Sequence, residues 1–137
     1  MNLSYPYTAI PQEPSGFLVQ FVDFEEGFTE GETLEEAAFN AAEVLSGVIA
    51  CRIDHGQAIP QPSPAEGRPV ALPSVTVQSA LLLRQSRGER SIADLARGLD
   101  TSWAAARRLE DPNHWPSLKQ LDRAARVLGR RLVLSME

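Results

Sequence analysis

The chain of 137 residues is poor in features that mark several classes of protein. Its single cysteine, Cys51, excludes a disulfide framework and a metal site built from thiolates. No apolar run approaches the roughly 18 residues of a membrane span, and residues 1–6 lack the basic stretch and apolar run of a signal peptide. We therefore expect a cytoplasmic protein without membrane contact, held together by hydrophobic cores.

Basic residues are scarce in the first half of the chain. Residues 1–77 contain 11 acidic and only 2 basic side chains, a net charge of −9, whereas residues 78–137 contain 7 acidic and 11 basic ones, a net charge of +4. A single compact domain with one partner has little reason to segregate charge in this way. The division predicts an acidic module for a cationic partner and a basic module for a polyanion.

Three short strands are expected at the start of the chain. Residues 3–10 are β-prone, although a proline confines them to a sheet edge. Residues 16–22 follow a turn and alternate in the period-2 pattern of a strand, and residues 27–30 fit a third, shorter strand. These segments predict a small antiparallel sheet.

A long helix should follow the strands. Thr33 and Glu36 have capping-box spacing, so that each side chain can satisfy the other's backbone donor. The helix should run to about Asp54 and end at Gly56. Apolar residues at helical spacing form one stripe, widened by Ala37 and Ala42, which consists of Leu34, Ala38, Ala41, Leu45, Val48 and Ile49. One such helix on one face of a small sheet gives a two-layer α/β sandwich.

Five of the ten prolines lie within residues 57–74, which predicts an extended and fairly stiff linker. A short strand near residues 68–72 could still join the first sheet. We therefore expect a first domain at residues 1–64, a linker with a possible short strand at 65–76, and a second domain at 77–137.

The second half predicts an all-α domain with a β-prone tail. Short helices are expected at residues 77–87, after Ser91, at 102–110, and after Ser117 as far as Gly129, with Ser91, Ser102 and Ser117 as N-terminal caps. The tail segment Leu132, Val133 and Leu134 has no partner strand in its own half, so we expect it to form a short strand that pairs with a second copy. The whole chain is thus predicted to be an α+β protein, and a homodimer or a higher homo-oligomer.

Two of the short helices are joined by a tight turn near residues 98–101, which is the arrangement of a helix-turn-helix. The outward side of the second helix carries two arginines, which can bind guanine edges in the major groove or bind phosphate. Hydroxyl groups at helix N-termini can help backbone amides to hold phosphates. The candidate DNA-binding residues are Ser91, Thr101, Ser102, Trp103, Ala104, Arg107 and Arg108.

The stretch from Leu95 to Glu110 resembles the Cro/C1-type DNA-binding domains. That family usually has glycine in the turn, where this chain has Asp100, and a polar residue at the start of the recognition helix, where it has Trp103. These departures affect which bases the recognition helix would contact more than they affect the fold. A single helix-turn-helix reads one half-site, so we expect a dimer on an operator whose half-sites are roughly 34 Å apart.

The first half resembles the HicB antitoxin family. The matching motifs are Tyr5-Pro6, residues 16–23, residues 27–37, Asn40-Ala41 and residues 59–63, in that order. The resemblance covers about residues 3–64 and implies a partial ribonuclease-H-like fold. It also implies an antitoxin that binds a small, basic, mRNA-cleaving toxin of the HicA type and represses its own operon, since HicB domains occur fused to Cro/C1-type domains.

An acidic surface suits such a partner, because it can stand in for the phosphates that an RNA-binding protein recognises. We expect the toxin contacts to come from carboxylates near the sheet edge and the helix start. These candidates are Asp23, Glu25, Glu26, Glu30 and Glu35.

Two other classes of function remain to be weighed. A ribonuclease-H-like enzyme needs carboxylates that converge on metal ions, and the spacing of Asp23, Glu36 and Asp54 does not favour convergence, so we expect no catalytic residue, metal or cofactor. A stand-alone transcription regulator with a small-molecule-sensing first domain is the alternative. Cys51 and Trp115 are expected to be core residues rather than functional ones.

Overall fold

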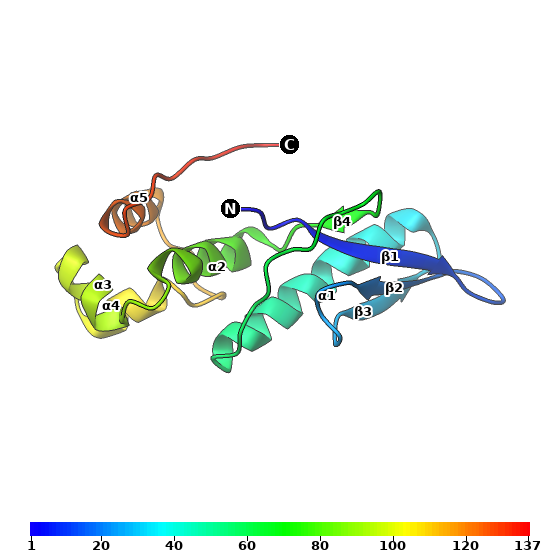
Figure 1. Cartoon of the computed structure of the whole chain (residues 1–137), viewed down its shortest axis with the longest axis horizontal. Helices are drawn as coiled ribbons and strands as arrows, with labels where there is room; N and C mark the ends of the chain where they lie inside the picture. The colour runs from blue at the N-terminus through cyan, green and yellow to red at the C-terminus, as the bar shows by residue number, and fades with distance from the viewer. The chain divides into compact units, whose positions relative to one another are not determined.

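The computed structural model describes all 137 residues, and they form two compact units, Met1–Val75 and Thr76–Glu137. The first unit combines a sheet with one long helix, and the second is helical (Figure 1). The predicted α+β class is therefore confirmed, with the strands in the N-terminal part of the chain.

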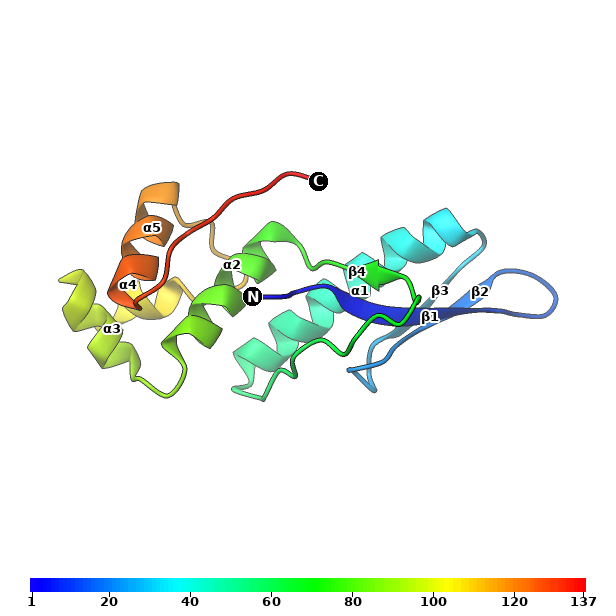
Figure 2. The same ribbon diagram turned by 45° about the horizontal axis from the view of Figure 1, so that its top comes forward.

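The first unit contains a four-stranded antiparallel sheet in the order β3-β2-β1-β4. Its strands are β1 (Tyr5–Pro11), β2 (Phe17–Phe21), β3 (Phe28–Gly31) and β4 (Val70–Ala71). β4 is the short strand expected near residues 68–72, and it pairs with the start of β1. The expectation that residues 3–10 lie at a sheet edge is therefore wrong, because β1 is an interior strand with β2 on one side and β4 on the other. The helix α1 (Leu34–Asp54) runs along one face of this sheet, as Figures 1 and 2 both show.

The period-2 alternation of the strands decides which sheet face is buried. The core side chains of β1 and β2 are Tyr5, Tyr7, Val19 and Phe21. The helix α1 buries Ala37, Ala41, Leu45, Val48, Ile49 and Ile53. Phe24 adds a further buried ring, whose centroid lies 5.1 Å from that of Tyr5. The core of the first unit is thus a single layer between one sheet face and one helix.

The predicted apolar stripe of this helix is wrong at its N-terminal end. Leu34 is 60% exposed and Ala38 is also exposed, whereas Ala37 is buried. The reason lies at Gly31, where an added Cβ would come within 2.5 Å of the backbone nitrogen of Ala37. The first turn of α1 approaches β3 at this glycine, and the approach turns Leu34 and Ala38 away from the sheet. The Thr33 cap itself is present, and its hydroxyl accepts the Glu36 amide at 3.1 Å.

The proline-rich segment is hydrogen-bonded to the first unit along much of its length. The Tyr5 hydroxyl donates to the Pro60 carbonyl at 2.7 Å, and the Tyr7 amide donates to the Pro69 carbonyl at 2.9 Å. Burial, together with the negative charge of Asp23, raises the pKa of Tyr5 to about 12. Much of the expected linker is therefore part of the first unit's hydrogen-bond network.

The second unit consists of four helices. They are α2 (Val75–Arg87), α3 (Ile92–Leu99), α4 (Trp103–Arg108) and α5 (Leu118–Val127). Ser91, Ser102 and Ser117 cap α3, α4 and α5 as predicted, each accepting the amide three residues on. The four helices share one hydrophobic core, which consists of Leu83, Leu95, Ala96, Leu99, Ala106, Leu109, Ala124 and Leu128.

The predicted C-terminal strand does not form within a single chain. Residues 130–137 have no regular secondary structure, and Val133 and Leu134 are 71% and 67% exposed. A strand needs a hydrogen-bonded neighbour, and a single chain offers none to this tail. A β-prone composition is therefore not sufficient to form a strand here.

The contact at Gly31 yields a prediction about stability. Gly31→Ala should lower the free energy of unfolding by about 2 kcal/mol, because the new methyl group overlaps backbone atoms of α1. Urea unfolding followed by tyrosine near-UV circular dichroism measures this directly, since both tyrosines are buried in the first unit.

Gly47→Ala is the matched control. It lies within α1 with nothing within 4 Å of its added Cβ, so alanine should stabilise the helix by about 0.5–1 kcal/mol. Equal effects of the two substitutions would contradict a tight contact at Gly31.

Candidate nucleic-acid and protein interfaces

The helices α3 and α4 form a tight helix-turn-helix around Asp100. This residue caps α3 in the left-handed region, with φ 53° and ψ 51°, a conformation that aspartate adopts more readily than most non-glycine residues. The next amide, of Thr101, donates to the Ala96 carbonyl at 3.0 Å. The helix continues through Gly98 and Leu99, so the turn is shorter than predicted. Aspartate thus adopts in this turn the left-handed conformation that glycine adopts most readily.

The helix α5 supports this pair of helices from one side. An added Cβ at Gly98 would come within 2.5 Å of Val127, so glycine permits the close approach of α3 and α5. The Arg123 guanidinium donates to the Leu99 carbonyl at 3.2 Å, which satisfies an acceptor at the end of α3. The turn is therefore held by packing and by a hydrogen bond from outside the motif.

The helix α4 has one buried and one open side, as predicted. Ala106 and Leu109 are in the core, with 0% and 6% of their surface exposed. The remaining predicted contact residues of the helix point outward, and these are Trp103, Ala104 and Arg108, all exposed, and Arg107, half-buried. Ser91, Thr101 and Ser102 are exposed at or beside the two helix N-termini.

The positive charge of α4 is available to a partner. No ion pair forms at Arg107 or Arg108. Arg97 pairs with Asp94, and Arg126 pairs with Asp122 at 3.2 Å, but all four of these side chains are substantially exposed. Exposed pairs contribute little to stability, so these arginines too can turn to phosphate.

A buried ion pair that the sequence analysis missed fixes the end of α4. Glu110 is 3% exposed, and its two carboxylate oxygens accept from Arg87 at 2.6 and 2.9 Å. The hydrogen bonds that Arg87 donates to Glu110 raise the pKa of Arg87 above its ordinary value. The pair joins the last turn of α2 to the end of α4. Nothing in the local sequence marks two residues this far apart as partners.

The five predicted toxin-contact carboxylates fall into two groups. Asp23 accepts hydrogen bonds from the amide and the hydroxyl of Ser63, and Glu26 forms a bidentate pair with Arg52 at 2.8 Å. The Arg52 hydrogen bonds lower the pKa of Glu26. The other three, Glu25, Glu30 and Glu35, are exposed, and the carboxylate of Glu30 accepts only a long 3.4 Å hydrogen bond from the side chain of Gln12.

Two residues expected in the core are on the surface instead. Cys51 is exposed, because α1 buries Ile49 and Ile53 and turns the intervening position to solvent. Trp115 is 74% exposed in the segment before α5.

No three His, Cys, Asp or Glu side chains gather closely enough to hold a metal ion. None of the helices is long and apolar enough to cross a membrane.

Comparison with known proteins agrees with the architecture. The family described as HicB-like antitoxin of bacterial toxin-antitoxin system matches residues 4–81. Antitoxin HicB of Escherichia coli K12 is 30% identical, with 98% of this chain and 99% of that protein covered. Antitoxin HicB 1 of Photorhabdus laumondii is 28% identical over 99% of this chain and 88% of its own length. Antitoxin HicB of Pseudomonas fluorescens is 29% identical over 93% of this chain and 90% of its own length.

The Arg87–Glu110 pair yields a prediction. Glu110→Gln should destabilise the second unit by about 3 kcal/mol, because it leaves a partly buried guanidinium without its counter-charge. Hydrogen exchange of peptides from α3 to α5, read by mass spectrometry, should show faster opening.

The control is Asp122→Asn, which breaks an exposed pair in the same unit and should change stability by less than about 0.5 kcal/mol. If Glu110→Gln behaves like this control, the buried pair does not hold α4.

Proposed function

The chain belongs to the HicB-like antitoxin family of bacterial toxin–antitoxin systems, and from this premise we propose that it neutralises a HicA-type, mRNA-cleaving toxin by direct binding. The family consists of antitoxins, not enzymes. The observation that carries the proposal is the charge of the first 77 residues, 11 acidic against 2 basic side chains. A surface of this kind attracts a basic RNA-binding protein and occupies the place of its RNA.

The five acidic candidates contribute to toxin binding in two different ways. Glu25, Glu30 and Glu35 carry exposed charges that are free to pair with the toxin. Glu26 shares its charge with Arg52, and Asp23 holds the proline-rich segment through Ser63. In this proposal Glu25, Glu30 and Glu35 contact the toxin, while Asp23 and Glu26 keep the surrounding loops in place.

The second unit, we propose, binds the promoter of the chain's own operon and represses it. The helix α4 enters the major groove, where Arg107 and Arg108 contact bases or phosphates and Trp103 and Ala104 lie against the groove. The hydroxyl groups of Ser91, Thr101 and Ser102 lie at helix starts, where phosphates are commonly held. The net charge of +4 in residues 78–137 supports this assignment.

The operator-binding form is proposed to be a homodimer. The tail residues Leu132, which is half-buried, and Val133 and Leu134, which are exposed, pair with the same segment of a second copy, which supplies the neighbour that this β-prone tail lacks. A chain without residues 131–137 should then be monomeric by light scattering. If the truncated chain remains dimeric, the tail is not the dimer contact.

Charge reversal tests the toxin-binding proposal. Glu25→Lys should slow association with the toxin at least about fivefold at low salt, with a smaller effect at high salt, because a charge at the edge of an interface acts mainly on the encounter rate. Biolayer interferometry with a nuclease-inactive toxin from the adjacent gene measures both.

Glu43→Lys is the control, because it makes the same charge change at an exposed position of α1. Equal rates for the two variants would remove Glu25 from the interface. An unmodified chain that does not bind the toxin at all would contradict the proposed function.

Promoter binding is tested at Arg108. Arg108→Ala should weaken binding to the operon's own promoter about tenfold, since a base or phosphate contact of arginine contributes about 1–3 kcal/mol. Fluorescence anisotropy across a salt series distinguishes the two kinds of contact: a phosphate contact lowers the salt slope by about 1.

Arg68→Ala, which removes a positive charge from the first unit, should leave promoter affinity unchanged. Wild-type affinity in Arg108→Ala would exclude that arginine from the interface.

A further inference from the structure

The first unit has a second sheet face that none of its helices covers. Register places Ile10, Leu18 and Glu30 in one row across β1, β2 and β3, and places Thr8, Gln20 and Phe28 in the next row. These residues alternate with the buried ones and therefore point away from α1. We call the surface formed by these six residues and Val22 the outer sheet face.

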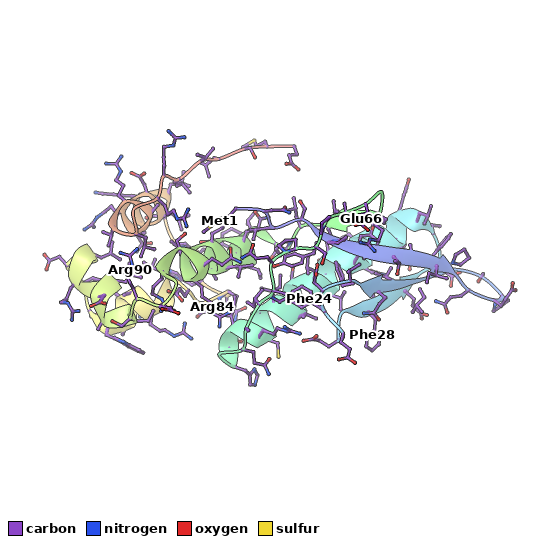
Figure 3. The ribbon with its side chains drawn as sticks, in the orientation of Figure 1. Met1, Phe24, Phe28, Glu66, Arg84 and Arg90 are labelled. Carbon is purple, nitrogen blue, oxygen red and sulfur yellow. The ribbon has the colours of Figure 1, made fainter.

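The outer sheet face is apolar where solvent-facing strands are usually polar. Its large hydrophobic side chains are substantially exposed: Ile10 at 54%, Leu18 at 41%, Val22 at 42% and Phe28 at 59%. Phe28 projects away from the ribbon in Figure 3. A contiguous group of exposed apolar side chains on adjacent strands is typical of an interaction surface.

The hydrogen-bond donors of Thr8 and Gln20 on this face are already used within the first unit. The Gln20 side-chain amide donates to the Phe24 carbonyl at 3.0 Å and to the Phe21 carbonyl at 3.1 Å. The Thr8 hydroxyl donates to the Gln20 carbonyl at 3.4 Å. These two donor groups therefore need no acceptor from a partner, which suits a largely apolar contact.

The edge of the sheet is less suited to a partner than its face. β3 is an edge strand, and its Glu30 carbonyl accepts from the Asn40 side chain of α1 at 2.8 Å. This bond uses an acceptor that an added strand would need. A partner of the first unit is therefore expected to meet the outer sheet face through side chains, not to extend the sheet.

Charge decides which partner fits. Glu30 lies on the face beside Leu18, and Glu25 lies in the turn between β2 and β3. The first unit's two basic residues are engaged within it, Arg52 with Glu26 and Arg68 with local carbonyls and Glu66. A second copy meeting this face would bring acidic rims together, whereas a basic partner with an apolar patch would be complementary.

We propose that the outer sheet face is the docking surface for the toxin, with Ile10, Leu18, Val22 and Phe28 as its apolar centre and Glu25 and Glu30 on its rim. The proposal rests on the toxin binding proposed above and assigns it to a surface. Glu35, at the start of α1, then lies outside the apolar centre.

Arginine substitutions test the proposal on the full chain. Phe28→Arg and Leu18→Arg should each weaken toxin binding at least about tenfold, because residues at the centre of an interface dominate its affinity. Phe39→Arg is the matched control: it makes the same change at a phenylalanine that is 68% exposed on α1 and should stay within about twofold of wild type. All three replaced side chains are exposed, and tyrosine near-UV circular dichroism confirms that the buried core is intact.

The outcomes separate this proposal from the one on which it rests. If the wild-type chain binds the toxin and both face variants bind within twofold of it, the outer sheet face is not the docking surface, and the antitoxin proposal stands. If the wild-type chain does not bind the toxin, both proposals fail. If Phe28→Arg reduces the oligomer size in light scattering but leaves toxin affinity unchanged, the face joins copies of this chain, which overturns the assignment.

Discussion

A sheet has two faces, and the first unit has one helix to cover them. This constraint determines most of what the unit can do. The face with Tyr5, Tyr7, Val19 and Phe21 packs on α1 and provides the stability of the unit. The other face keeps its apolar side chains in solvent, which is unfavourable for an isolated domain but favourable for one that binds a partner. Stability and binding are thus assigned to opposite sides of the same strands.

The close approach of α1 to β3 makes this division possible. Gly31 lets the first turn of the helix come within contact of the strand backbone, and Asn40 of the helix donates to the same strand. The helix is thereby fixed on one face and also protects the edge. In the second unit Gly98 has the same role for α3 and α5. In both units a glycine allows a helix to approach closely enough to orient the exposed residues beside it.

Local signals were the part of the structure that the sequence predicted well. The serine and threonine caps, the strand alternation at residues 16–22 and the break before α5 depend on neighbours in the chain, and all are present. The orientation of α4 was also predictable, because alanines and a leucine at helical spacing identify its core side. These features need no knowledge of the rest of the fold.

Errors arose where distant residues decide the outcome. The position of Leu34 depends on the backbone contact at Gly31, and the exposure of Cys51 depends on which side of α1 meets the sheet. The Arg87–Glu110 pair joins residues whose sequence spacing carries no signal. The tail is β-prone, but pairing depends on a neighbour that one chain does not contain. The outer sheet face was not predicted, because the alternation of residues along a strand does not show which face of the sheet a single helix leaves uncovered.

Charge separation keeps the two proposed binding functions from interfering with each other. The acidic first unit repels nucleic acid, so DNA is directed to the second unit. A basic toxin is repelled by the second unit and attracted by the first. Within the first unit, Arg52 and Arg68 are held by internal contacts, so the few positive charges do not weaken this attraction. The same separation discourages the outer sheet face from closing on a second copy, because like charges on its rim would meet. Under the proposed assignment, the apolar surface can therefore remain exposed until a basic partner binds.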